Sequence, residues 1–407
     1  MVRGRGSTWF LVGVAGLLVG LSYILYTPVP DGVSQPWKLQ IFMASVKLAG
    51  VVSEIGHLLG CGSRNNMTRM IFEKLVGTGV VSKSDPELYV TDELFDGVAV
   101  RIYYPRAAKK PLPCLVYYHG GGFVWMSVNS YDGVAAVYAK GAKVAVVSVE
   151  YRLAPEYPYP IPFEDCRRAT MFLLKNADDF DIDPTRIAIG GDSSGGNIAA
   201  ALAIKFRDDQ VLPRIRRQIL IYPMLQFCDA RLPVHVEQRE FSPFYAQQMA
   251  FIFGMYVNLT IDQLSLMATG NFSTKSLREK CRRCVDYKLL PHNLVPHDYK
   301  RRDVIAPADN PYAQDIEKLV SDPKIAPLMT ENLSELPPAF ILTVKVDGLR
   351  DEGIIYAKRL EQAGVHVKWM HLPDTFHGVL SFYRGVFGFD AAQRGQRYII
   401  EYLSENM

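Results

Sequence analysis

One serine in this sequence lies in a pattern that is typical of a hydrolytic nucleophile. Ser193 is the centre of Gly191-Asp192-Ser193-Ser194-Gly195, a Gly-x-Ser-x-Gly motif. An apolar run that is typical of a β-strand precedes the motif, and an alanine-rich run that is typical of a helix follows it. This context predicts a nucleophile elbow, a tight turn that holds Ser193 in a strained backbone conformation above a sheet.

The acid and the base that would activate this serine follow it along the chain. The order Ser193, Asp347, His377 is the order of the catalytic triad in α/β hydrolases. Asp347 and His377 each come just after an expected strand, where catalytic groups gather in open α/β sheets. We expect His377 to accept the proton of Ser193, and Asp347 to hold the imidazole and stabilise its charged form.

Neighbouring residues compete for the same two roles. His366 is expected inside a strand, and His371 at the end of that strand, short of the loop that follows. Asp351 and Glu352 fall at the start of an expected helix, where acidic side chains commonly cap the first turn. We therefore prefer the acid and the base that lie just beyond the strands.

A second glycine cluster could stabilise the charge that forms on an ester carbonyl. His119-Gly120-Gly121-Gly122 follows a continuous apolar run, and its glycines expose backbone N–H groups. We expect the N–H groups of Gly121, Gly122 and Ser194 to form the oxyanion hole. His119 and Gly120 complete this loop motif, and His119 is expected to orient the loop through hydrogen bonds. This chemistry requires no metal and no cofactor.

The hydrophobic pattern predicts the elements that position these groups. Alternating strands and helices over residues 88–225 and 337–407 predict an α/β-hydrolase fold, with a mostly parallel central sheet flanked by helices. A helical segment at 28–87 and a helical, irregular insertion at 226–336 are expected to form lids. The helices of 37–81 could cover the active site, lie against a bilayer, or pack as ordinary core.

Residues 1–27 are expected to form a membrane anchor. Arg3 and Arg5 precede an uncharged run, Trp9–Tyr26, that is long enough to span a bilayer. The positive charges hold the N-terminus in the cytosol, so the rest of the chain would lie in the lumen. A cleaved signal peptide is the alternative, and it places the main domain in the same compartment. Four glycosylation acceptor patterns agree with a lumenal domain: Asn66, Asn258, Asn271 and Asn332.

Composition excludes several other classes of protein. The 407 residues carry a formal net charge of only +3, and no basic stripe interleaved with aromatics suggests nucleic acid. The six cysteines are too few for a disulfide scaffold in a chain of this length. Cys281-x-x-Cys284 lacks the second pair of a zinc site, so a local disulfide or two free thiols are expected.

Five motifs together carry a family resemblance. They are His119-Gly-Gly-Gly122, Tyr151-Arg-Leu-Ala-Pro-Glu156, Gly191-Asp-Ser-Ser-Gly195, Asp347-Gly-Leu-Arg-Asp-Glu-Gly353 and Phe376-His377-Gly378. The set resembles the hormone-sensitive-lipase family of α/β hydrolases, which carry a GDXG motif. The anchor followed by helices resembles the arylacetamide deacetylase branch of that family. The resemblance implies a serine carboxylesterase that acts on lipophilic esters or arylacetamides. It also implies a single-pass type II protein of the endoplasmic reticulum membrane, with a lumenal catalytic domain.

This sequence departs from that pattern in two places. Ser194 stands where the family usually has alanine, a change that a backbone N–H contact should tolerate. Val124 and Val344 stand where arylacetamide deacetylase has a disulfide, so no bridge is expected between them. Some relatives in the family are receptors that lack a working base, which makes a catalytically silent ligand-binding protein the alternative. The presence of His377 favours an enzyme.

Overall fold

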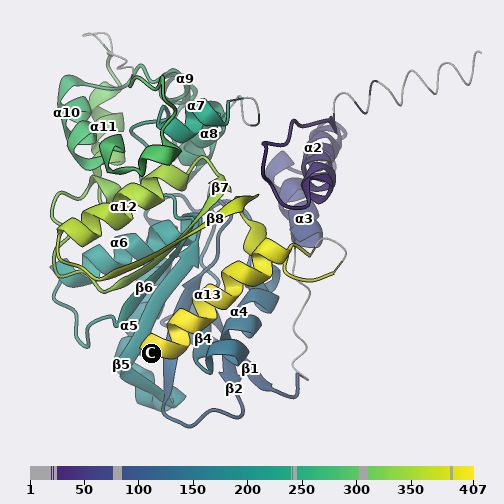
Figure 1. Cartoon of the computed structure of the whole chain (residues 1–407). Helices are drawn as coiled ribbons and strands as arrows, with labels where there is room; N and C mark the ends of the chain where they lie inside the picture. Colours follow the sequence, from purple (N-terminus) through teal and green to yellow (C-terminus); the bar gives the residue numbers. More distant parts are fainter. Residues whose placement is uncertain are drawn as a thin grey trace, which may run out of the picture.

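The computed structural model describes residues 25–76, 85–239, 245–301, 310–385 and 388–407, together with Gly20, Ser22 and Phe241. Most of the predicted anchor therefore lies outside the described residues. The remaining elements form a central sheet, helices on both of its faces, and further helices at one of its ends (Figure 1).

Eight strands form one sheet in the order β1-β2-β4-β3-β5-β6-β7-β8. β1 pairs antiparallel with β2 and β2 with β4, whereas all other neighbours are parallel. The prediction of a mostly parallel sheet is thus confirmed. The strands span β1 Leu88–Phe95, β2 Val98–Pro105, β3 Leu112–Tyr118, β4 Ala145–Val149, β5 Ile182–Asp192, β6 Arg217–Ile221, β7 Ala339–Val346 and β8 Val367–Phe376.

Helices cover both faces of the sheet because its inner strands are apolar on both faces. In β3, Leu115 and Tyr117 pack into one core cluster, and Cys114, Val116 and Tyr118 pack into the other. The first cluster includes residues of α4 (Val128–Ala142) and α13 (Asp390–Asn406). The second includes residues of α5 (Ile161–Asn176), α6 (Ser194–Asp208) and α12 (Arg350–Gln362).

The remaining helices gather in two groups beyond the upper end of the sheet as drawn in Figure 1. One group comes from the N-terminal segment, and the other from the insertion between β6 and β7. They are α2 Pro36–Leu58 and α3 Arg64–Val76, then α7 Pro233–Glu237, α8 Tyr245–Val257, α9 Ile261–Thr269, α10 Lys275–Cys284 and α11 Ala313–Ser321. Short 3₁₀ turns lie at Ala177–Phe180, Tyr287–Leu289, His292–Leu294, Pro327–Met329 and Val379–Ser381.

The N-terminal helices are fixed to the body of the fold, the sheet with the helices on its two faces, by specific contacts. Arg69 donates from Nε to the Val124 carbonyl at 2.7 Å and pairs with Glu156 at 2.7 Å. The Phe42 ring packs on Phe382, with 4.8 Å between ring centroids. Within the described part of the chain, α2 is the one helix that is long and apolar enough to cross a membrane, by length and composition.

Two acidic residues that we expected to cap α12 have a different role. Asp351 accepts a hydrogen bond from Val234 N at 2.8 Å, and Glu352 accepts one from Leu225 N at 2.8 Å. Both carboxylates are buried, because α12 packs against the start of the insertion. They therefore hold the insertion to the body, and the prediction that they cap the helix was wrong.

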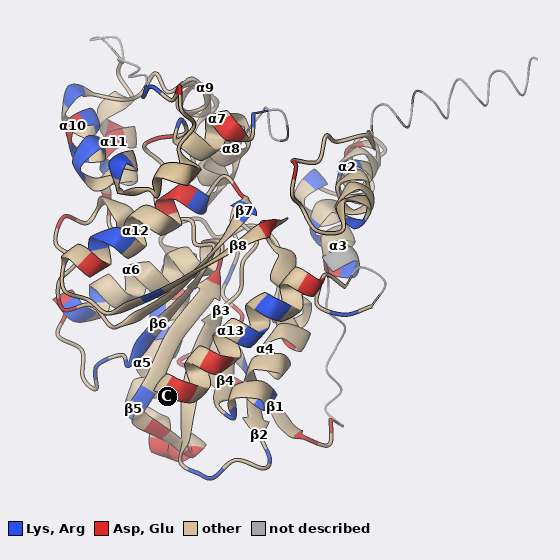
Figure 2. Ribbon diagram, viewed as in Figure 1, with Lys and Arg blue, Asp and Glu red and all other residues tan. Residues whose placement is uncertain are grey.

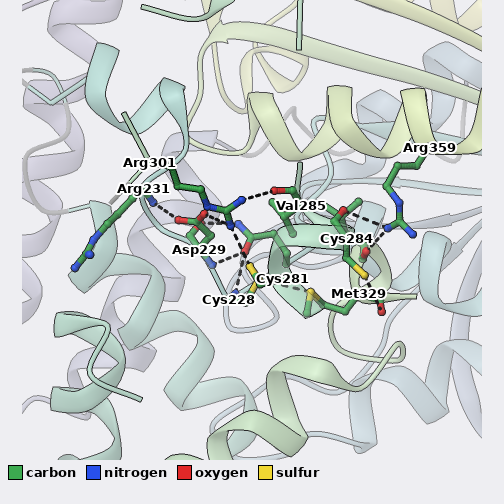
Figure 3. Close-up of a disulfide and its surroundings, with 11 residues drawn as sticks. Cys228, Asp229, Arg231, Cys281, Cys284, Val285, Arg301, Met329 and Arg359 are labelled. Carbon is green, nitrogen blue, oxygen red and sulfur yellow. Dashed lines mark hydrogen bonds and ion pairs between the residues drawn. A yellow bond between two sulfur atoms is a disulfide. The ribbon is translucent and has the colours of Figure 1, made fainter. Parts of the chain in front are cut away.

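The insertion also contains a disulfide, which joins Cys228 to Cys281 across 53 positions (Figure 3). Our two expectations for Cys281 and Cys284, a local bridge or two free thiols, are both wrong, because Cys281 pairs with Cys228 and only Cys284 of the two is free. Cys284 is a buried thiol near the Met329 carbonyl. An ion pair between Arg301 and Asp229 at 2.8 Å lies beside the disulfide.

Candidate active site

The nucleophile elbow is the turn between β5 and α6. Ser193 has φ 54° and ψ −119°, a conformation that side chains rarely adopt, directly before the first residue of α6. A Cβ on Gly195 would lie 1.9 Å from the Tyr118 carbonyl oxygen, and one on Gly191 would lie 2.3 Å from the same atom. The turn is therefore possible only with glycine on both sides of the serine. The strained backbone predicted for Ser193 is confirmed.

Replacing Gly195 with alanine should disrupt this turn. Because the new methyl would meet backbone that cannot move aside, we expect a loss of about 1–3 kcal/mol or more in the free energy of unfolding. Ester hydrolysis should be lost as well, and both are measurable by thermal unfolding and turnover. Gly50→Ala is the matched control, since a Cβ there meets nothing within 4 Å. Wild-type stability and turnover in Gly195→Ala would contradict the prediction.

The structure brings the predicted nucleophile, base and acid into contact. His377 Nε2 lies 3.0 Å from Ser193 Oγ, and His377 Nδ1 lies 3.0 Å from Asp347 Oδ2. The other Asp347 oxygen accepts a hydrogen bond from Leu349 N at 2.8 Å, which fixes the carboxylate. Asp347 and His377 follow β7 and β8 directly. These neighbouring parallel strands bring the two side chains to one edge of the sheet.

Electrostatics distinguish His377 from the other histidines of this region. Burial opposes its protonation, but the Asp347 carboxylate, together with the Asp192 carboxylate, outweighs burial and raises the pKa of His377 above its ordinary value. Burial lowers the pKa of His119 and of His371 to about 4. His371 lies 3.0 Å from Thr343 Oγ1 on β7, so its ring does not face Ser193. Two expected positions are corrected: His366 precedes β8 instead of lying inside it, and His371 lies inside β8 instead of at its end, because the strand runs on to Phe376.

The glycine loop lies beside the elbow with N–H groups available. Gly121 and Gly122 have φ of 116° and 63°, values that favour glycine. Among the described residues, none accepts a hydrogen bond from the N–H of Gly121, Gly122 or Ser194. The N–H of Ser193 is not available, since it donates to the Ile221 carbonyl at 2.9 Å.

Asp192, inside the elbow motif, supports the glycine loop. Sequence reasoning did not predict this role. Its carboxylate accepts hydrogen bonds from Gly120 N at 2.9 Å, Tyr117 Oη at 2.9 Å and Tyr131 Oη at 2.7 Å. Burial raises the pKa of Asp192, and hydrogen bonds from the two tyrosines oppose that shift. The carboxylate itself could have indicated this role, because a buried aspartate needs hydrogen-bond donors close to it.

His119 packs where we expected it, within the loop and away from the nucleophile. Its Nδ1 lies 2.8 Å from the Gly120 carbonyl, and its ring stacks on Tyr151 with centroids 4.3 Å apart. Tyr151 Oη also donates to the His119 carbonyl at 2.7 Å. These contacts are suited to orienting the loop.

A cavity of about 360 Å³ opens above Ser193 and is lined mainly by apolar side chains. The N-terminal helices and the insertion contribute Phe42, Phe72, Phe241, Met249 and Ile252 to its walls, and the segment after β8 contributes Phe382. The sequence pattern did not identify these residues as cavity walls. Its size and apolar walls fit a small lipophilic ligand. In the described part of the chain, no group of three or more His, Cys, Asp or Glu side chains could hold a metal ion.

Comparison with known proteins identifies similar chains. A family model described as alpha/beta hydrolase fold matches residues 115–280 and 296–381. Neutral cholesterol ester hydrolase 1 of Bos taurus is 34% identical over 97% of this chain and 98% of its own length. Arylacetamide deacetylase of Bos taurus is 31% identical over 100% of both chains. EstE1, a thermostable carboxylesterase cloned from a metagenomic library, has 26% sequence identity to this chain, and its crystal structure matches with a TM-score of 0.64. This match covers 84% of the present chain and 97% of EstE1.

Proposed function

This chain belongs to the arylacetamide deacetylase and neutral cholesterol ester hydrolase family of α/β hydrolases, and we propose that it is a membrane-anchored serine esterase. Its class of activity is carboxylic ester hydrolysis. The single observation that carries the proposed mechanism is the line of contacts from Ser193 through His377 to Asp347 beneath an apolar cavity.

In the first half-reaction, Ser193 Oγ attacks the ester carbonyl carbon while His377 Nε2 takes its proton. Asp347 stabilises the imidazolium that results. The carbonyl oxygen gains negative charge, which the N–H groups of Gly121, Gly122 and Ser194 accommodate. A single such donor typically contributes about 2.7–4 kcal/mol to lowering the barrier. His377 then gives the proton to the departing alkoxide. The alcohol is released, and the acyl group remains bound to Ser193 Oγ.

In the second half-reaction, water replaces the alcohol. His377 takes a proton from the water as it attacks the acyl carbon, and returns that proton to Ser193 Oγ when the acid leaves. The triad thus begins and ends in the same protonation state. Apart from the water, every group that takes part in these steps belongs to the chain or to the substrate.

The cavity indicates the class of substrate. Its walls are aromatic and aliphatic, so binding energy comes mainly from removing apolar substrate surface from water. We propose lipophilic esters as substrates, with arylacetamides as a second class. The relatives' names refer to cholesterol esters and to arylacetamides, and both are apolar molecules with a hydrolysable carbonyl.

We place the protein in the endoplasmic reticulum membrane, as a single-pass type II protein with a lumenal catalytic domain. The apolar run Trp9–Tyr26, with arginines on its N-terminal side, supports the anchor and its orientation. Three acceptor asparagines, Asn66, Asn258 and Asn332, are exposed, whereas Asn271 is only partly exposed. The exposed three are the better candidates for glycosylation.

Hydrolysis of a p-nitrophenyl ester series by membranes containing the chain tests this function. We expect turnover of at least some members, with a preference for acyl groups that the apolar cavity encloses. A folded chain that is inert toward every member would overturn the proposal and favour a binding protein on the same fold.

The pH dependence should report His377. Because the base must be unprotonated, kcat/KM should fall as the pH decreases through the pKa of His377, and Asp347 keeps that pKa above the ordinary 6.5. Replacing Asp347 with asparagine removes the main cause of the upward shift, so the acid limb of the remaining activity should move to lower pH. The measurement is kcat/KM for a soluble ester against pH. An acid limb that stays in place would contradict this role of Asp347.

A further inference from the structure

Helix α2 has a continuous apolar seam that no described residue covers. Seven apolar residues repeat at alternating spacings of four and three along its length, which places them on one side of a helix. They are Trp37, Ile41, Ala44, Leu48, Val51, Ile55 and Leu58; all but the small Ala44 are between 45% and 76% exposed. We call these seven residues the α2 seam.

The opposite side of α2 faces α3 and the body of the fold. Leu39, Ala49 and Ser53 are buried there, and Phe42 reaches the cavity above Ser193. Because these contacts hold α2 in the fold, its exposed apolar residues can meet an apolar partner only at the molecular surface. The seam is therefore the outer surface of a helix whose inner surface forms a wall of the active site.

The charged residues of α2 avoid the seam. Lys38 donates to the Gly388 carbonyl, Lys47 donates to the Tyr26 carbonyl at 2.6 Å, and Glu54 pairs with Arg64 at 3.2 Å. The ribbon of α2 is mostly tan in Figure 2, in contrast to α10 and α13, which carry many charged residues. An uninterrupted apolar surface of this length requires a partner that is itself apolar.

The bond from Lys47 to Tyr26 indicates which partner covers the seam. Tyr26 is the last residue of the apolar run Trp9–Tyr26, and its carbonyl is held against the middle of α2. Any bilayer that contains this run therefore begins beside α2. Trp37 lies at one end of the seam, and tryptophan is common at membrane interfaces.

We propose that the α2 seam lies in the interfacial region of the same bilayer that holds the N-terminal run. This inference rests on the membrane anchor of the proposed function and extends it, because it adds a second contact and orients the domain. The wall that contains Phe42 then lies between the lipid and Ser193, so lipophilic esters can enter the cavity from the membrane. The partner is a lipid surface, recognised by its hydrocarbon and not by its head-group charge.

A fluorescent probe on the full chain tests this arrangement. The exposed thiol Cys61 is first replaced with serine, and Leu48→Cys then carries an environment-sensitive nitrobenzoxadiazole label. The protein is placed in phosphatidylcholine vesicles, some with nitroxide-labelled acyl chains. We expect a blue-shifted label that the nitroxide quenches. The matched control is Leu212→Cys, 75% exposed in the loop before β6, where the label should remain unquenched.

Two results of this experiment would overturn the proposal. The first is quenching at position 48 no stronger than at position 212. The second is a blue-shifted but unquenched label that depends on protein concentration, since this would mean that a second copy covers the seam. Neither result involves ester hydrolysis, so both are distinguishable from failure of the proposed catalytic function, and co-flotation of the chain with the vesicles shows separately whether the anchor is inserted.

Kinetics provide a second test. Leu48→Gln with Ile55→Gln should reduce kcat/KM for a long-chain ester dissolved in vesicles by about tenfold, because polar amides would leave the lipid. Turnover of a short, soluble ester should not change, since neither side chain lines the cavity. A loss for the vesicle-borne ester no larger than for the soluble one contradicts the proposal.

Discussion

Replacing Ser193 with alanine should reduce kcat/KM for any ester substrate by about 10⁴-fold or more, while the protein remains folded. The hydroxyl is the only part of this side chain that reacts, and it lies 3.0 Å from the base. The strained backbone and both flanking glycines are unchanged by the substitution. The measurement is turnover of a soluble ester, with thermal unfolding as the check on the fold.

Ser194→Ala is the matched control for this result. It removes a hydroxyl from the next residue, yet leaves in place the backbone N–H that would face the oxyanion. We therefore expect activity within a few-fold of wild type. Equal losses in the two variants would mean that the elbow, and not the nucleophile, had been damaged.

Replacing His377 with glutamine should cause a loss of similar size, about 10⁴-fold in kcat/KM. Glutamine can still form a hydrogen bond with Ser193, but it cannot accept the proton of the hydroxyl. The lost function is therefore general base catalysis and not positioning alone. Steady-state kinetics on the same soluble ester measure it.

His371→Gln provides the comparison for His377. His371 is the nearest rival in sequence, but burial keeps its pKa at about 4 and it contacts Thr343 instead of Ser193. We expect this variant to retain most of its activity. Inactivation by His371→Gln with little effect of His377→Gln would contradict the assignment of the base.

The positions of the candidate catalytic residues were predictable because each lies in a local pattern with one structural solution. Gly191 and Gly195 permit the tight turn that holds Ser193, because any larger side chain at either position would meet backbone atoms. Parallel pairing of β7 with β8 then brings the residues that follow these strands together. Neither step requires knowledge of distant packing, so the triad could be inferred from motif and topology.

The walls of the cavity depend on distant packing, and sequence periodicity does not reveal it. The pattern of α2 predicted a helix, but not that Phe42 would face the active site while the seam faced outward. The same limit applies to Cys281, whose partner lies 53 positions away and not three. Asp351 and Glu352 were misassigned as caps, because the backbone donors that they bind belong to the insertion.

Covalent labelling with an alkyl phosphonate tests the central claim most directly. Attack by an activated serine displaces the leaving group from phosphorus and leaves a stable phosphonyl ester on the oxygen. We predict one adduct per chain, located by mass spectrometry on Ser193, with labelling lost in Ser193→Ala and strongly slowed in His377→Gln. A wild-type chain that hydrolyses esters but carries no adduct at Ser193, or carries it on another residue, would contradict the account.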